Sequence, residues 1–274
     1  GGIHTQNLIG TTNDLDIVNL FVGFVTDPDQ SIIDPETGDR TNTKLQRATH
    51  VLAGIEYDVN DKLTLNLEPY FKDFSQIINI NRNRTQIGES VYAAETGEAY
   101  GIDFSAKYDS RRWYLWAAYS LTRVTRNDGE QEYPPIFDRR HNLNLLATYT
   151  FGSDLQWEAS ARWNYGSGFP FTEIQGFSSI FFFNQGLDTD PLTDNPDLYT
   201  IPSEDRNGGR LPDYSRIDLS LKYTKEFNKY LSLEVVGSVT NLSDRDNIFF
   251  FVAEENQRIN QLPILPSLGV NLNW

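Results

Sequence analysis

Histidine, serine and carboxylate side chains are the groups in this chain that could do chemistry, and none of them is spaced for catalysis. The three histidines, His4, His50 and His141, lie far apart and share no metal-ligand spacing. No serine has the strand–turn–helix setting that a nucleophile elbow requires. Cysteine is absent, which excludes disulfides and thiolate metal sites. We therefore expect a protein that is not an enzyme.

Acidic residues form two clusters that offer oxygen ligands. The clusters are Asp188, Asp190, Asp194 and Asp197, and Asp27, Asp29, Asp34, Glu36 and Asp39. Calcium typically takes about six to eight oxygen ligands, although neither cluster has the spacing of an EF-hand. Two interpretations stay open, namely solvated acidic loops or a calcium site at residues 188–197. No other cofactor is expected.

Apolar and polar side chains alternate along nine segments, which predicts β-strands. These strands must position the candidate residues. The segments are residues 51–59, 63–71, 100–108, 113–121, 143–151, 155–165, 217–223, 231–239 and 268–274, with a further strand end at 1–4. Each apolar stripe spans about nine to eleven residues, which crosses a bilayer at the tilt of a barrel strand. No apolar run reaches the roughly 18 residues of a transmembrane helix. The net charge of −15 argues against nucleic acid as a partner.

The lengths of the connections separate two all-β folds, since a soluble sandwich alternates in the same way. Short connections lie near residues 60–61, 110–111, 152–154 and 228–229. Long connections cover residues 5–44, 81–97, 126–138, 172–211 and 246–262. Outer-membrane barrels have short periplasmic turns and long extracellular loops. The sequence therefore predicts an antiparallel transmembrane β-barrel rather than a sandwich.

Aromatic side chains fit two interfacial belts of such a barrel. The periplasmic belt would contain Tyr57, Tyr108, Trp113, Tyr149, Phe151, Trp157, Tyr223 and Trp274. The outer belt would contain Phe71, Tyr119, Trp163 and Tyr165. Trp274 would end the last strand at the periplasmic side, where it resembles the terminal signal that the barrel-assembly machinery reads.

Six segments, in their order and spacing, resemble one family. They are Gly-Ile-His-Thr-Gln at 2–6, Glu-Ala-Tyr-Gly-Ile-Asp-Phe at 98–104, Phe-Asp-Arg-Arg-His-Asn-Leu at 137–143, Leu-Pro-Asp-Tyr-Ser-Arg-Ile-Asp-Leu at 211–219, Val-Thr-Asn-Leu-Ser-Asp-Arg-Asp-Asn at 239–247 and Pro-Ser-Leu-Gly-Val-Asn-Leu-Asn-Trp at 266–274. Together they resemble the C-terminal part of the barrel of a TonB-dependent outer-membrane receptor of the Bacteroidetes-like type.

The resemblance implies a barrel of about 22 strands, of which the last nine or ten lie in this chain, around a plug domain that contacts TonB. This sequence contains neither plug nor TonB box. Outer-membrane lipids, lipopolysaccharide, the barrel-assembly machinery and a surface lipoprotein are the other partners expected in a Gram-negative outer membrane. The implied function is uptake of a scarce ligand, which the sequence does not identify. The alternatives are a scaffold subunit of an outer-membrane assembly and a self-contained ten-strand barrel enzyme.

Charged residues fall on the polar face of the predicted strands, which would line the lumen. They are Glu56, Glu68, Lys72, Asp103, Lys107, Glu158, Arg162, Arg216, Asp218, Lys222 and Glu234. Such charges are costly on a lipid-facing surface, so their placement supports the barrel. They form either cross-strand pairs, each of small energy, or contacts to the plug or the cargo.

Two phenylalanine-rich stretches fall in predicted long loops. Their candidate contact residues are Phe177, Phe181, Phe182 and Phe183, and Phe249, Phe250 and Phe251. Exposed apolar groups of this kind mark a contact surface for cargo or a lipoprotein. The other interpretation is that they pack on one another or extend strands beyond the membrane.

Overall fold

The computed structural model describes residues 32–33, 40–41, 46–80, 92–179, 198–228, 231–252 and 257–274. Every regular element in these residues is a β-strand, and almost every pairing is antiparallel, which confirms the prediction of an all-β antiparallel chain. None of these residues belongs to a helix that is long and apolar enough to span a membrane. The chain divides into unit 1, Gly1–Ala106 with Ala118–His141, and unit 2, Lys107–Ala117 with Asn142–Trp274.

Unit 1 is a sheet of long strands that follow one another along the chain. Its elements are β1 (Ile32–Ile33), β2 (Arg40–Thr41), β3 (Arg47–Leu52), β4 (Ile55–Asn60), β5 (Leu63–Ile80), β8 (Glu132–Tyr133), and most of β6 (Tyr92–Asp109) and β7 (Trp113–Asn127). Strands β3 and β4 pair with β5, β5 pairs with β6, and β7 pairs with β8. Strand β1 pairs with β2 and makes one parallel bridge to β6.

A proline on β5 separates β3 from β4 in unit 1. The prediction of one strand over residues 51–59 is wrong, because β3 ends at Leu52 and β4 begins at Ile55. The registers of β3 and β4 on β5 place Ala53 opposite Pro69. The Ala53 amide donates to the Pro69 carbonyl at 3.2 Å. Proline has no N–H to return this bond, so the ladder breaks there.

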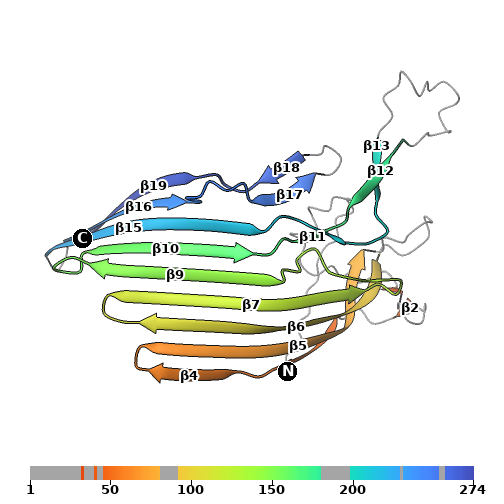
Figure 1. The fold of residues 1–274 in the computed structure, drawn as a ribbon, viewed down its shortest axis with the longest axis horizontal. Coiled ribbons are helices and arrows are strands. Elements are labelled where there is room, and N and C mark those ends of the chain that lie inside the picture. The colour runs from red at the N-terminus through yellow and green to blue at the C-terminus, as the bar shows by residue number, and fades with distance from the viewer. Residues whose placement is uncertain are drawn as a thin grey trace, which may run out of the picture. The chain divides into compact units, whose positions relative to one another are not determined.

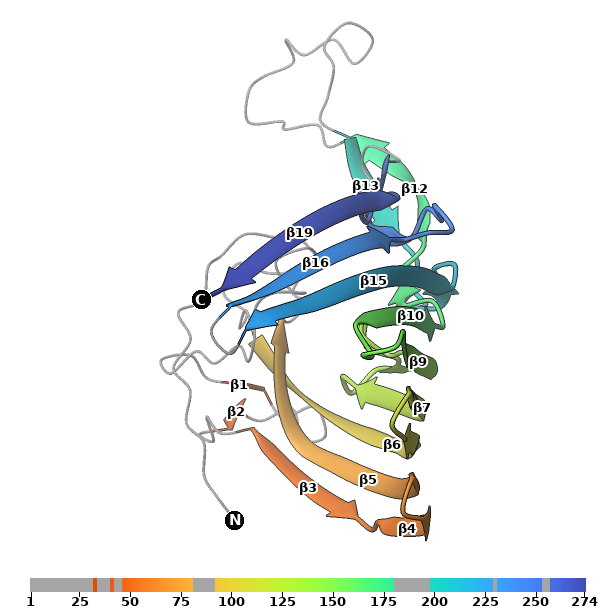
Figure 2. The same ribbon diagram turned by 90° about the vertical axis from the view of Figure 1, so that its left-hand side faces the viewer.

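The main strands of unit 2 are antiparallel, and each pairs along its length with the next (Figures 1 and 2). Their order is β9 (His141–Phe151), β10 (Trp157–Gly166), β15 (Tyr214–Asn228), β16 (Leu231–Thr240) and β19 (Leu265–Asn273), although His141 itself belongs to unit 1. The short turn between β9 and β10 lies at the same end of these strands as the C-terminus (Figure 1).

Three two-stranded ladders complete unit 2 within connections that the sequence predicts to be loops. They are β11 (Pro170–Phe171) with β14 (Gly209–Arg210), β12 (Ile174–Ser179) with β13 (Leu198–Pro202), and β17 (Ile248–Val252) with β18 (Gln257–Asn260). Strand β6 likewise begins at Tyr92, inside the predicted loop 81–97. The strands therefore extend beyond their apolar stripes. The predicted strand at residues 155–165 begins too early. Leu155 lies in a turn with φ of 55°, and β10 begins at Trp157.

Local side-chain bonds hold the short turns. The Asn60 side chain accepts from the amides of Lys62 and Leu63 at 2.9 and 3.1 Å. Asparagine favours turns because its side chain can replace a backbone acceptor in this way. The Ser110 hydroxyl accepts from the Trp113 amide at 3.2 Å. Gly152 adopts φ of 98°, a conformation that favours glycine.

The apolar stripes form exposed faces rather than a core. In unit 2, Leu219, Leu221, Leu268 and Val270 are between 40% and 76% exposed. Among the described residues, the buried apolar side chains are few and lie in unit 1: Ile77, Ile78, Ala94, Ala99 and Tyr133. A contiguous apolar face of this kind marks a surface that contacts something other than water.

A tyrosine lies across a glycine on the polar face of unit 1. The Tyr70 hydroxyl is 2.9 Å from the Thr122 hydroxyl, so its ring spans from β5 over β6 to β7. Gly101 on β6 leaves the space for that ring. A Cβ atom at residue 101 would lie 2.5 Å from the Leu121 carbonyl oxygen and 2.8 Å from the Tyr70 hydroxyl oxygen.

We predict that Gly101→Ala destabilises the protein by about 1–3 kcal/mol, because the added methyl group overlaps both neighbours. Alanine in a strand is otherwise more favourable than glycine. Thermal unfolding of the detergent-purified protein measures the change. Gly176→Ala is the control, since a Cβ there meets nothing within 4 Å. Equal stability of the two variants would contradict the close contact.

Candidate functional site

The predicted lumen charges of unit 2 share one face of its sheet. The registers pair Glu158 with Lys222 and Arg162 with Asp218 across β10 and β15. Glu234 pairs with Thr224 in the next ladder. Since paired residues in a ladder point to the same side, these groups and the serines between them form one polar strip.

Within this strip, the charges bond to one another. The Lys222 Nζ lies 2.8 Å from the Glu158 carboxylate, and both side chains are about one-third exposed. The Arg216 Nε donates to Asp218 at 3.1 Å. Exposed pairs of this kind contribute little stability, about 0–1 kcal/mol. The strip is therefore a solvent-accessible surface with charges of both signs rather than a single strong binding pocket.

The predicted charges of unit 1 are less connected. Within the described part of the chain, no ion pair joins Glu56, Glu68 or Asp103 to a cation. The Lys72 Nζ lies 5.3 Å from the centre of the Tyr70 ring. Lys107, which belongs to unit 2, lies 3.9 Å from Asp109. Glu56, Glu68 and Asp103 are at least partly open to solvent.

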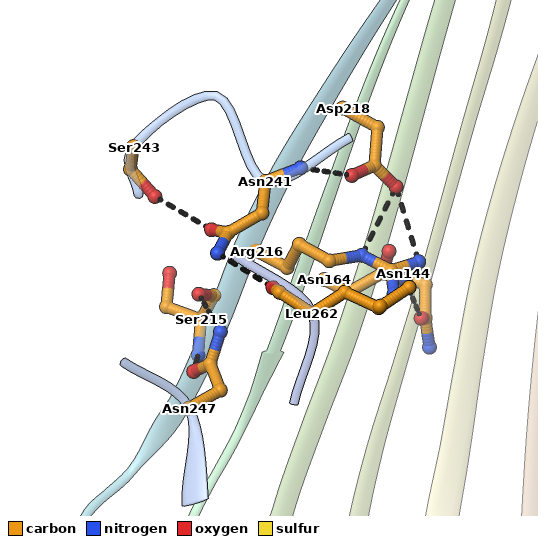
Figure 3. Close-up of polar contacts among 9 residues, drawn as sticks. All are labelled: Asn144, Asn164, Ser215, Arg216, Asp218, Asn241, Ser243, Asn247 and Leu262. Atoms are coloured by element: carbon orange, nitrogen blue, oxygen red, sulfur yellow. Dashed lines mark hydrogen bonds and ion pairs between the residues drawn. The ribbon is translucent and has the colours of Figure 1, made fainter. Parts of the chain in front are cut away.

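A buried asparagine organises the end of β16 that leads into the β17–β18 hairpin (Figure 3). Asn241 is fully buried and has φ of 53°. Its Nδ2 donates to the carbonyls of Arg245 and Leu262 at 3.0 and 3.1 Å. Its amide donates to Asp218 at 2.9 Å. Asp218, a predicted lumen charge, thus also fixes the base of this long connection.

A second asparagine ties the same connection to β15. Asn247 is buried, accepts from the Ser215 amide and donates to the Ser215 carbonyl, both at 2.9 Å (Figure 3). The Arg245 guanidinium donates to the Asp213 carbonyl at 2.9 Å. The Asp213 carboxylate accepts from the Tyr165 hydroxyl at 2.8 Å. The bases of two long connections, residues 167–213 and 241–264, are therefore joined.

Unit 1 buries a glutamate that lies within a predicted long connection, residues 81–97. Glu95 lies in β6 and is 2% exposed. Its carboxylate accepts from the Tyr133 hydroxyl at 2.8 Å and from the Asn79 amide at 3.0 Å. The Arg126 guanidinium lies 3.8 Å away. This cluster joins β5, β6, β7 and β8 at the base of the connection after β7.

The remaining candidates are only partly described. Phe177 lies in β12, and Phe249, Phe250 and Phe251 lie in β17, with Phe249 44% exposed. Phe181, Phe182, Phe183, Asp188, Asp190, Asp194, Asp197 and His4 lie outside the described residues. The described residues contain no group of three or more potential metal ligands. The His141 Nδ1 is 2.8 Å from the Tyr119 hydroxyl.

Comparison with known proteins identifies the barrel. Residues 13–242 match the family model described as TonB dependent receptor-like, beta-barrel. This chain belongs to that family. The match rules out a soluble sandwich, and the family is one of receptors rather than enzymes. No curated protein sequence matches the chain.

Solved receptors share the fold at low sequence identity. The ferric-catecholate import receptor Fiu of E. coli K12 is 16% identical, with a TM-score of 0.56 over 85% of this chain and 29% of that one. The ferripyoverdine receptor of the outer membrane of Pseudomonas aeruginosa is 14% identical, with a TM-score of 0.57 over 91% and 30%. The ferric citrate transporter FecA is 15% identical, with a TM-score of 0.54 over 83% and 31%. This receptor chain thus spans about a third of their length.

We predict that Glu95→Ala destabilises the receptor by about 2–3 kcal/mol, because Tyr133, Asn79 and Arg126 lose a buried common acceptor. Protease cleavage after β7, at residues 128–138, should accelerate with the loss of stability. Thermal unfolding and timed proteolysis measure both effects. Glu98→Ala is the control, since Glu98 is exposed on the same strand. Unchanged proteolysis in Glu95→Ala would show that the cluster does not hold this connection.

We predict a loss of about 1–3 kcal/mol for Asn241→Ala, because the carbonyls of Arg245 and Leu262 lose their donor and alanine disfavours a positive φ. Amide hydrogen exchange in the β17–β18 hairpin should rise with it. The control is Ser243→Ala, whose exposed hydroxyl makes only a 3.4 Å contact to Asn241. Equal exchange in the two variants would contradict the anchoring role of Asn241.

Proposed function

We propose that this chain is part of an outer-membrane receptor that takes up a scarce ligand with energy from TonB. The match of residues 13–242 to the TonB-dependent receptor barrel carries the proposal. Three of the similar structures are an import receptor for ferric catecholate, a receptor for ferripyoverdine and a ferric citrate transporter. A ferric siderophore is therefore the first ligand class to test, before a cofactor, peptide or glycan.

The two faces of the sheets support this role. The exposed apolar stripes face lipid, and the polar strip with Glu158 and Lys222 lines the lumen, because lipid-facing charges are costly. The short turns are periplasmic, and the hairpins β12–β13 and β17–β18 are extracellular. Phe249 and its neighbours then contact cargo or a surface lipoprotein. The loop carboxylates at 188–197 bind calcium if they bind any cation.

The complete receptor has about 22 strands, with this chain supplying the C-terminal nine or ten of a Bacteroidetes-like barrel. The segments 98–104, 211–219 and 239–247 support this, as does the third of the receptors' length that the chain spans. A plug domain that binds TonB lies elsewhere in the receptor. Trp274 is read by the barrel-assembly machinery, and lipopolysaccharide surrounds the extracellular rim.

A scaffold role is the second candidate, favoured by the joined loop bases at Asn241 and Asp213. A receptor-like barrel whose loop bases are fixed in this way could hold a partner lipoprotein without transporting anything. Such a protein would bind no small ligand and would not need TonB.

Deletion of the gene in its host and measurement of radiolabelled ligand accumulation test the proposal. We expect the deletion strain to lose accumulation of one ligand from a panel of ferric catecholate, ferric citrate, cobalamin and peptides. The complemented strain should recover it only when TonB is present. Unchanged accumulation of every ligand, together with loss of a co-purifying protein, would support the scaffold instead.

A further inference from the structure

The apolar face of unit 2 contains a groove of about 460 Å³. Four short residues line it, namely Ala147, Ala159, Ala161 and Gly237. The registers place them side by side, with Ala147 opposite Ala161, Ala159 opposite Leu221, and Leu221 opposite Gly237. A Cβ atom at residue 237 would meet nothing within 4 Å, so the groove is open above the glycine.

An aromatic row borders the groove on its short-turn side. Trp113 and Tyr149 line the groove and lie 4.4 Å apart between ring centres. The row continues from Tyr149 to Phe151 at 5.7 Å and from Phe151 to Trp157 at 6.2 Å. Tyrosine and tryptophan favour the level where lipid headgroups meet hydrocarbon. The groove therefore begins at headgroup level and runs into the apolar layer.

Two arginines lie at the same level. The Thr150 amide donates to the Arg112 carbonyl at 2.8 Å, which places Arg111 and Arg112 beside the end of β9. Both side chains are exposed, and neither has a hydrogen-bond or ion-pair partner in the part of the chain that the structure describes. In a chain with a net charge of −15, two unpaired guanidinium groups next to an apolar groove suit a ligand with one anionic and one apolar end.

The size of the groove indicates which kind of molecule could occupy it. Twelve residues line it, whereas a stable protein interface uses about 20–30 residues on each side. A second copy of the receptor or a partner protein would thus cover far more surface than the groove provides. A single acyl chain needs only an apolar channel, and arginine binds a phosphate through paired N–H donors.

We propose that the groove and the Arg111–Arg112 turn form a binding site for one phospholipid, with an acyl chain over Gly237 and the phosphate at the arginines. This rests on the proposed membrane placement of the barrel. This site would retain one lipid molecule, whereas lipids on the rest of the apolar face would exchange freely.

Native mass spectrometry of the whole receptor tests the site, after delipidation in detergent and addition of dioleoyl phosphatidylglycerol. Gly237→Leu fills the groove and should reduce the lipid-bound fraction at least about tenfold. Gly269→Leu is its matched control, because residue 269 is equally open and lies on the polar face by its pairing with Val236.

The double change Arg111→Gln with Arg112→Gln should weaken binding of phosphatidylglycerol about tenfold. Binding of dioleoylglycerol, which has no phosphate, should stay unchanged. Lys62→Gln at another short turn is the charge control.

Several results would overturn the site. They are equal retention in Gly237→Leu and Gly269→Leu, a change in oligomeric mass instead of lipid mass, or lipopolysaccharide as the only retained molecule. The assay does not depend on transport. A receptor that retains phospholipid but accumulates no ligand refutes only the proposed uptake. One that accumulates ligand but shows no Gly237-dependent lipid refutes only the lipid site.

Discussion

Backbone pairing is the constraint on which the rest of this structure depends. An unpaired amide or carbonyl in hydrocarbon costs several kcal/mol, so a strand in a membrane must bond to a neighbour along its length. The registers from β9 through β10, β15 and β16 to β19 run without a break across the apolar zone. Pro69 on β5 interrupts its ladder locally, and its carbonyl still accepts from the Ala53 amide.

At the ends of the long strands some polar groups have no partner in the ladder. Buried side chains form hydrogen bonds with them. Asn241 and Asn247 do this where β16 leads into its hairpin, and Glu95 does it in unit 1. Asp138, also fully buried, accepts from the Val124 amide at 3.1 Å. Hydrogen bonds thus fix the bases of these connections on the strands that carry them.

The sequence was sufficient to predict most of the long strands and their two faces, because alternation at period two carries both. It left the strands of residues 174–202 and 248–260 as one of two interpretations of the phenylalanine-rich stretches, since strands outside the apolar layer no longer need alternating side chains. Glu95 was missed for the same reason. The roles of Asn241 and Asp218 depend on contacts between distant strands, which no local pattern encodes. Asp218 was predicted only as a lumen charge, and Asn241 was marked only by its place within the family-like segment 239–247.

The contact of Tyr70 with Gly101 and Thr122 links three strands through one ring. A longer residue at 101 is compatible with the fold only if residue 70 becomes smaller, and the hydroxyl at 122 then loses its partner. The residues at these three positions therefore constrain one another. A smaller residue at position 70 would free the space for a side chain at position 101, so the choice of residue on β6 depends on the neighbouring strands.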